Sequence, residues 1–348
     1  MSTQVPTVPV AEVSPGRGGR QLVDTIIRVR ELGLVAVLAL LVLITTAINS
    51  RFLSSQNIRD ILLNVAIVAL LAVGQTVVVV TRNIDLSVGS VLGFVAFATG
   101  VLFADHGVSI PVAFAAGILI GAAFGGANGL LVSLGRVPSL VVTLGTLYII
   151  RGADFAWASG RQINAADLPN SFLKIGSESV LGIPVLPLIT VVVMVAVGTV
   201  MRSYRAGREL YAIGSNPEAA TLAGIRVTRR VFAAFVASGA LAGLAGVLYA
   251  ARFGTIDATA GTGIELQVVS AVVVGGVAIF GGSGTVYGAA LGALLLSTIG
   301  SALVILKVNP FWEQAIDGAL LLVAIALDRL LALRVSSLLQ KRSGRRAH

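Results

Sequence analysis

The stretch ILLNVAIVALLAVGQTVVVVT, residues 61–81, contains no charged side chain. A helix needs roughly 20 predominantly apolar residues to cross a hydrocarbon core about 30 Å thick, and this stretch supplies them. Its apolar residues are continuous, without the apolar–polar alternation of a membrane β-strand, which argues against a β-barrel. The stretch therefore predicts a membrane-spanning helix.

The rest of the chain repeats this pattern. Of 348 residues, 56% are hydrophobic and only 12% are charged, and the mean hydropathy is +0.95, whereas a soluble domain carries about 25% charged residues. Apolar segments run at about 33–49, 61–81, 86–103, 110–134, 139–151, 183–201, 230–252, 265–280, 285–306 and 312–333. We therefore predict an all-α polytopic membrane protein with about 10 transmembrane helices, with broken backbone in the Gly/Ser-interrupted region around 82–90.

The positive charges predict the orientation of these spans. Cytoplasmic loops of membrane proteins are enriched in Lys and Arg. An arrangement with both termini inside puts 18 of the 25 Lys and Arg residues on the cytoplasmic side. We divide the chain into a disordered cytoplasmic tail (1–30), a transmembrane domain (31–334) and a basic cytoplasmic tail (335–348). Two longer connections remain, 152–182 outside and 202–229 inside.

Composition excludes several kinds of site. The chain has no cysteine, so disulfides, iron–sulfur clusters and thiolate chemistry are excluded, and two histidines, His106 and His348, are too few for a His-based metal site. We predict no metal and no cofactor. The net charge of +9 is explained by the cytoplasmic loops, so it does not predict a nucleic-acid partner.

An internal repeat relates the two halves of the chain. IDLSVGS at 84–90 resembles IELQVVS at 264–270, GAAFG at 121–125 resembles GAALG at 288–292, and RVP at 136–138 resembles KVNP at 307–310. The matches relate spans 2–5 to spans 7–10. A shift of five helices is odd, so the copies face opposite ways across the membrane, as in transporters with inverted repeats.

Glycines provide packing surfaces. Gly117, Gly121, Gly125 and Gly129 recur every four residues and so lie on one helix face. Small residues allow transmembrane helices to pack closely. We expect this face to pack within one subunit, although a contact between subunits would use the same pattern.

Catalytic and nucleotide-binding motifs are not found. Gly281–Thr285 is glycine-rich but lacks the lysine of a phosphate-binding loop, and no nucleophile elbow or zinc-protease motif occurs. The centres of the spans are nearly free of charge, which suits a neutral hydroxylated solute better than an ion. The expected translocation path consists of Asn83, Asp85, Ser87, Asn128, Thr143 and Glu265. Hydrogen bonds between helices would explain each of these residues equally well.

The inside loop contains a short helix with its own capping signals. In the stretch GSNPEAATLAGIR, residues 214–226, Asn216 is a good N-cap, Pro217 suits the first helical position and Glu218 favours the positive end of the helix dipole. Gly224 is placed to end the helix in a left-handed conformation. So short a helix is not stable alone in water, so we expect it to dock into a groove on another subunit; the alternative is a solvated linker.

This loop resembles the E-A-A…G element of ABC importer permeases, and the resemblance extends over about residues 30–335. TRNIDLSVGS (81–90), VTLGT (142–146), GTGIEL (261–266) and GGSG (281–284) are similar to stretches of the permeases for ribose, xylose, arabinose, galactosides, rhamnose and the quorum signal autoinducer two. TRNID and NPFW (309–312) are most similar to the rhamnose and autoinducer-two members.

The resemblance implies a bacterial inner-membrane importer of several subunits. A second permease copy or related chain would complete the pore, cytoplasmic ATPase subunits would hydrolyse ATP, and an extracytoplasmic sugar-binding protein would deliver the solute, in part through charged residues of 152–182. Glu218, Ala219, Ala220 and Gly224 would form the coupling helix to the ATPase. A stand-alone carrier or channel, or an integral membrane enzyme, are the alternative functions.

Overall fold

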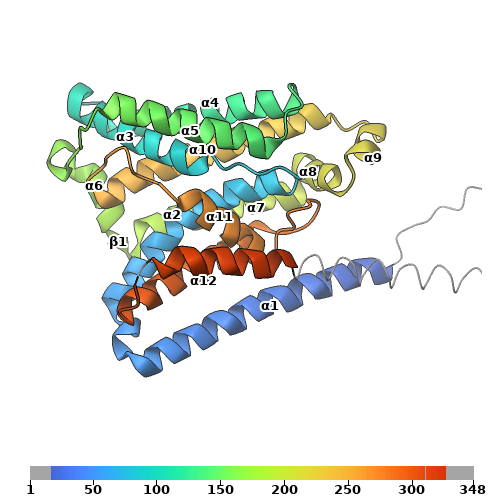
Figure 1. The fold of residues 1–348 in the computed structure, drawn as a ribbon, viewed down its shortest axis with the longest axis horizontal. Helices are drawn as coiled ribbons and strands as arrows, with labels where there is room; N and C mark the ends of the chain where they lie inside the picture. The colour runs from blue at the N-terminus through green and yellow to red at the C-terminus, as the bar shows by residue number, and fades with distance from the viewer. Residues whose placement is uncertain (1–16, 310, 327–348) are drawn as a thin grey trace, which may run out of the picture.

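The structure, a computed structural model, describes residues 17–309 and 311–326, with side chains from Leu32 onward. Long helices lie side by side along one axis and leave two distinct ends (Figure 1). One end carries α6 and β1, and the other carries α8, α9 and the start of α1. We call these the α6 end and the α9 end.

The elements follow most of the expected segments. The α-helices are α1 (Arg17–Ile48), α2 (Ser55–Val79), α3 (Val88–His106), α4 (Ile110–Ser133), α5 (Ser139–Ala158), α6 (Asn170–Ser177), α7 (Val185–Ser203), α8 (Arg205–Ser215), α9 (Pro217–Leu222), α10 (Val227–Phe253), α11 (Ile264–Val274) and α12 (Val286–Ile305), with helical backbone again at 312–326. Two 3₁₀ turns are η1 (Ser50–Leu53) and η2 (Ala165–Asp167), and β1 (Ser179–Val180) pairs with β2 (Ile183–Pro184) in an antiparallel hairpin.

Seven of the described helices are long and apolar enough to cross a membrane: α2, α3, α4, α5, α7, α10 and α12. This confirms an all-α polytopic membrane protein. The apolar part of α1, Leu32–Ile48, is shorter. Helix α1 begins at Arg17, so it includes part of the expected tail; residues 1–16 and the basic tail at 335–348 lie outside the described residues.

The expected span at 265–280 is wrong in length. Helix α11 has only 11 residues and ends at Val274. Gly276 follows with a φ of +94°, a left-handed conformation that ends a helix. A Cβ on Gly275 would lie 2.3 Å from the carbonyl oxygen of Gly288, so α11 ends where the backbone of α12 passes. The backbone that precedes α11, residues 254–263, is also non-helical.

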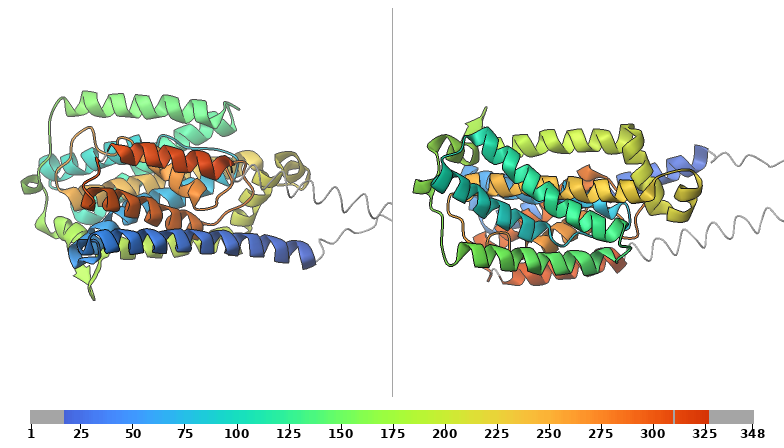
Figure 2. Two further views of the ribbon diagram at one scale, coloured as in Figure 1. Left: turned by 60° about the horizontal axis from the view of Figure 1, so that its bottom comes forward. Right: turned by 90° about the horizontal axis from the view of Figure 1, so that it is seen from above.

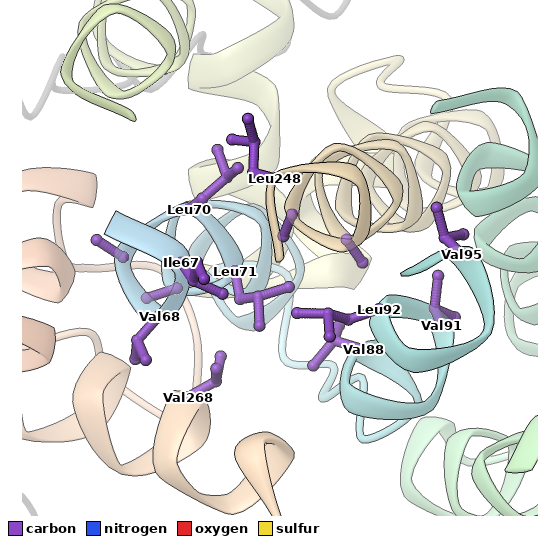
Figure 3. Packing of buried hydrophobic residues seen from close by; sticks show 14 of the residues in the cluster. Ile67, Val68, Leu70, Leu71, Val88, Val91, Leu92, Val95, Leu248 and Val268 are labelled. Carbon is purple, nitrogen blue, oxygen red and sulfur yellow. The ribbon is translucent and has the colours of Figure 1, made fainter. Parts of the chain in front are cut away.

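Helix α2 lies at the centre of the bundle. It packs against α7, α10, α11 and α12, and the run quoted at the start of the sequence analysis is buried over most of its length. Figure 3 shows Leu70 and Leu71 of α2 among side chains from three other helices, with Leu92 of α3, Leu248 of α10 and Val268 of α11 nearby. By contrast, α5 lies at an edge of the bundle in both views of Figure 2.

The last pair of repeated motifs follows two oppositely directed helices, α4 and α12. Helix α4 runs toward the α9 end, because Gly129 near its C-terminus packs on Phe232 at the start of α10. Helix α12 runs the other way, because Asn49 after α1 donates a hydrogen bond to the carbonyl of Ile305. Arg136 after α4 and Lys307 after α12 both adopt left-handed conformations, with φ of +55° and +56°. The two copies are therefore inverted relative to each other.

Candidate functional site

Helix α9 has the capping that its sequence predicts. The side-chain oxygen of Asn216 accepts hydrogen bonds from the backbone N–H groups of Glu218 and Ala219, each at 3.0 Å, which satisfies two donors that a helix start leaves free. Pro217 is the first helical residue. Gly224 has a φ of +79°, a conformation that a side chain would strain. The short helix therefore has a fixed start and a fixed end.

The residues of α9 divide into a packed face and an open face. Ala220 is buried, whereas Glu218 and Ala219 are exposed and Leu222 is 90% exposed. Helix α9 stands at the end of the bundle, beside α8 (Figure 1). The exposed side chains of Glu218, Ala219 and Leu222 are therefore accessible to another subunit.

Helix α8 is held to the bundle by charges. Glu209 forms ion pairs with Arg205 on its own helix and with Arg230 on α10. Hydrogen bonds from Arg205 and then from Arg230 lower the pKa of the Glu209 carboxyl below its ordinary value, so the carboxylate stays charged near neutral pH. Since Glu209 is itself buried, these pairs fix how α8 sits against α10.

The junction between α8 and α9 contacts the loops of both repeats. Arg82, in the break between α2 and α3, donates from Nε to the carbonyl of Gly214 at 2.5 Å and from Nη2 to that of Ser215 at 2.6 Å. From the other repeat, the N–H of Gly282 bonds the carbonyl of Val80 at 2.9 Å, and a Cβ on Gly282 would lie 2.9 Å from the backbone nitrogen of Ser215. Movement of α9 would therefore act on both loops.

Three of the six expected path residues form one buried hydrogen-bonded cluster. Asp85 accepts from the N–H of Ser87 at 3.0 Å and from its hydroxyl at 2.6 Å, and Asn128 donates to that hydroxyl at 2.8 Å. Gln75 of α2 is placed to pair with the backbone N–H and C=O of Asp85, each at 3.1 Å. The cluster joins α2, the break after it and α4. Most of its polar groups are paired within the protein, but the Oδ1 of Asn128 has no hydrogen-bond partner among the described residues.

The other three expected path residues lie around this cluster without joining it. The Thr143 hydroxyl donates to the carbonyl of Ile84 at 3.3 Å, and Asn83 donates to Thr81. Glu265, at the start of α11, lies against α3, because a Cβ on Gly89 would be 2.2 Å from its Oε2. That oxygen has no hydrogen-bond partner among the described residues.

The four glycines of α4 lie at its contact with α10. A Cβ on Gly121 would lie 2.2 Å from the carbonyl oxygen of Gly239, and one on Gly125 would lie 2.2 Å from that of Phe235. Gly117 and Gly129 meet Val247 and Phe232 of the same helix. The face therefore packs on a neighbour within the same chain.

A polar cavity of about 380 Å³ opens among α2, α10, α11 and α12, away from the Asp85 cluster. It lies at the α6 end, since its lining includes the start of α2 and the end of α10. Its polar lining is Asn57, Asp60, Asn64, Tyr249, Arg252, Gln267, Ser297, Ser301 and Glu313. None of the six expected path residues lines it.

Comparisons with known proteins agree with the motifs. The model of a family described as "Branched-chain amino acid transport system / permease component" matches residues 57–325. The chain belongs to this family of permeases.

Curated relatives of the permease include "Autoinducer 2 import system permease protein LsrC" from several bacteria. The Enterobacter sp. (strain 638) protein is 38% identical over 307 residues, 87% of this chain and 88% of the relative. The Escherichia coli (strain K12 / DH10B) protein is 35% identical over 299 residues, 86% of each chain. No solved structure matches. These relatives confirm the resemblance to ABC importer permeases of the sugar and autoinducer-two type, and the permease is a transport subunit of such a system.

The sequence did not predict the cavity of the permease, because none of its lining residues belongs to a recognisable motif. Asn57, Asp60 and Asn64 are separated by three and four positions, so they share one face of α2. Ser297 and Ser301 do the same on α12. These spacings were readable in the sequence, but which helices bring the two faces together was not.

Proposed function

We propose that this permease is the membrane-spanning subunit of an ATP-driven importer for a neutral, polyhydroxylated solute of sugar size, such as autoinducer two, ribose or rhamnose. The observation that supports it most is α9, a self-capped helix whose exposed residues face away from the bundle. In this proposal Glu218, Ala219 and their neighbours dock onto a separate ATPase subunit. The permease itself hydrolyses no ATP.

The contacts at the α9 end supply a route for coupling. Arg82 and the loop of Gly281 and Gly282 belong to opposite repeats and meet at the α8–α9 junction. A displacement of α9 by the ATPase would exert force on the Arg82 loop and the Gly281–Gly282 loop at the same time. Rocking of one inverted repeat against the other is the usual basis of alternating access.

The proposed solute class rests on the relatives and on the polar cavity. Relatives 35–38% identical are named for import of autoinducer two. Neutral amides and hydroxyls line much of the cavity, and these groups both donate and accept, as sugar hydroxyls do. The family description names branched-chain amino acids, and Arg252 with Asp60 and Glu313 offers both charges that a zwitterion needs, so leucine is the second candidate.

The proposed partners follow from the ends of the bundle. With both termini cytoplasmic in a bacterial inner membrane, the α9 end faces the ATPase subunits and the α6 end faces a solute-binding protein. Asp167 and Glu178 are exposed there, whereas Asp154, in the same expected contact region, is buried in α5 and is not available to that partner. A second permease copy or related chain would complete the pore.

Substitution on the open face of α9 tests the coupling. Ala219→Arg should abolish uptake because its side chain fills the docking surface, and Ala219→Ser should retain it. Ala220 is a poorer test, since it is buried and an arginine there would also disturb packing. Ala219→Ser is the matched control, because it keeps a small side chain at the same exposed position. Uptake by Ala219→Arg at the normal rate, or uptake of solute without any ATPase subunit, would instead favour a stand-alone carrier.

A further inference from the structure

We infer that the cavity between α2, α10, α11 and α12 is a solute-binding site within a single permease subunit, selective for a neutral polyhydroxylated molecule. The inference rests on the proposed function and gives it a location. The cavity volume of about 380 Å³ lies within the range of small-molecule sites, about 300–1,000 Å³.

The first argument is an unpartnered buried hydroxyl. Ser297 lines the cavity, is only 6% exposed, and its oxygen has no hydrogen-bond partner among the described residues. A buried polar group without a partner is costly. A hydroxyl or carbonyl of a solute in the cavity would satisfy it.

The second argument is a set of free amides around the same space. No hydrogen bond of the Asn64 or Gln267 side chain is found within the described part of the chain, and both line the cavity. Asn57, in contrast, is held in place, since it donates to the carbonyl of Phe52 at 2.8 Å and accepts from Ser301 at 2.8 Å. The site therefore combines fixed walls with amides free to bind.

The third argument is the non-helical backbone before α11. Helix α11 starts at the cavity with Ile264, and no side chain caps its first turn. The N–H of Ile264 donates to the carbonyl of Gly261 at 3.4 Å, whereas the next N–H groups of the first turn have no intrahelical partner and favour oxygen acceptors. Discontinuous helices with free ends at the interface of inverted repeats form the substrate sites of many transporters, and here α2 comes from one repeat and α10, α11 and α12 from the other.

The charged groups of the site are two carboxylates and one guanidinium. Asp60 and Glu313 are acidic and Arg252 is basic, and Arg252 is also held over the ring of Phe253 at 4.7 Å. Gly300 leaves room for the Glu313 carboxylate, because a Cβ there would lie 2.5 Å from its Oε1. Carboxylates accept hydrogen bonds from hydroxyl groups, so both acidic side chains can bind a polyhydroxylated solute. The same three charges suit a zwitterion, so leucine is tested beside the sugars.

The absence of cysteine in this chain makes the site directly testable. Gln267→Cys and Asn64→Cys each introduce one thiol into the cavity, and Ser50→Cys introduces a matched exposed thiol at the same end, outside the cavity. Each variant is placed in right-side-out vesicles carrying the whole importer. A membrane-impermeant thiol reagent is then applied with or without D-ribose, L-rhamnose, autoinducer two or L-leucine.

We expect a sugar or autoinducer two to slow labelling of both cavity thiols about tenfold when present at roughly ten times its dissociation constant, and to leave the Ser50→Cys thiol unchanged. If wild-type vesicles take up one of these solutes while both cavity thiols label at full rate, the site is wrong and the proposed function stands. Protection by leucine alone would overturn the solute class. If wild-type vesicles take up none of the four, the proposed function itself fails.

Discussion

At the residue scale, the permease uses polar side chains in two different ways. At Asn216 one side-chain oxygen fixes the start of an exposed helix. In the second way, the side chains of Asp85, Ser87 and Asn128 form hydrogen bonds with one another inside the bundle. Both arrangements satisfy backbone or side-chain groups that a broken helix leaves open. Only the first leaves a neighbouring surface free for a partner.

Loss of the cap should weaken coupling in proportion to the helix it stabilises. Asn216→Ala removes the acceptor for two N–H groups and should cost about 1 kcal/mol of α9 stability, enough to lower the ratio of ordered to disordered α9 about fivefold. Uptake should fall accordingly, while the amount of permease in the membrane stays normal. Asn216→Asp keeps a capping oxygen and should transport nearly as well as the wild type. Equal loss in both variants would show that the amide itself, and not the cap, is needed.

At the element scale, the packing of α4 on α10 depends on backbone approaching backbone. Helices in lipid gain no hydrophobic free energy from meeting each other, so close contact of small residues carries more of the association. Gly121 and Gly239 face each other so closely that each would direct a Cβ to within 2.2 Å of the other's carbonyl oxygen. A Cβ on Gly126, which also belongs to α4, would meet only side-chain atoms, at 3.8 Å and beyond.

This difference predicts opposite outcomes for the same substitution on one helix. Gly121→Ala should force α4 from α10 and destabilise the permease by about 1–3 kcal/mol or more, the usual cost of overpacking. Gly126→Ala should be neutral or slightly stabilising, because alanine favours a helix by about 1 kcal/mol over glycine. Thermal unfolding of the two purified variants in one detergent measures both. Similar midpoints would show that α4 and α10 are not packed in this way.

The elements show how far the sequence could predict the structure. Helices α2 and α9 were predictable because their signals are local: a long uncharged run in one, and a cap, a proline and a glycine in the other. Helix α11 was predicted too long, because a glycine pair in an apolar run gives no sign that another backbone passes there. The cavity could not be predicted, since it forms only where faces of α2 and α12, far apart in sequence, are brought together. Asp85, Ser87 and Asn128 were predicted as part of a translocation path, and that role stays a prediction. Their hydrogen bonds to one another and to Gln75 depend on the same packing.

At the scale of the whole molecule, the proposed arrangement of partner subunits requires that the two ends of the bundle face opposite compartments. Leu181, in the turn between β1 and β2, is 98% exposed, and Leu222 of α9 is 90% exposed. Helix α7 lies between them in sequence with 19 residues, a length of about 28 Å, close to the hydrocarbon thickness of about 30 Å. One leucine marks the end proposed for the binding protein, and the other marks the end proposed for the ATPase.

Single thiols at these two leucines test that arrangement. An impermeant reagent should label the Leu181→Cys thiol in cells with a permeabilised outer membrane, and should label the Leu222→Cys thiol only in inverted inner-membrane vesicles, because α7 separates the two positions by one crossing. Since both leucines are almost fully exposed, neither result depends on local burial, and each variant is the control for the other. Adding the ATPase subunits should then slow labelling of the Leu222→Cys thiol alone, since that helix would be covered. Labelling of both thiols from one side would mean that α7 does not span the membrane, and reversed sides would place α9 where no ATP-driven subunit could reach it.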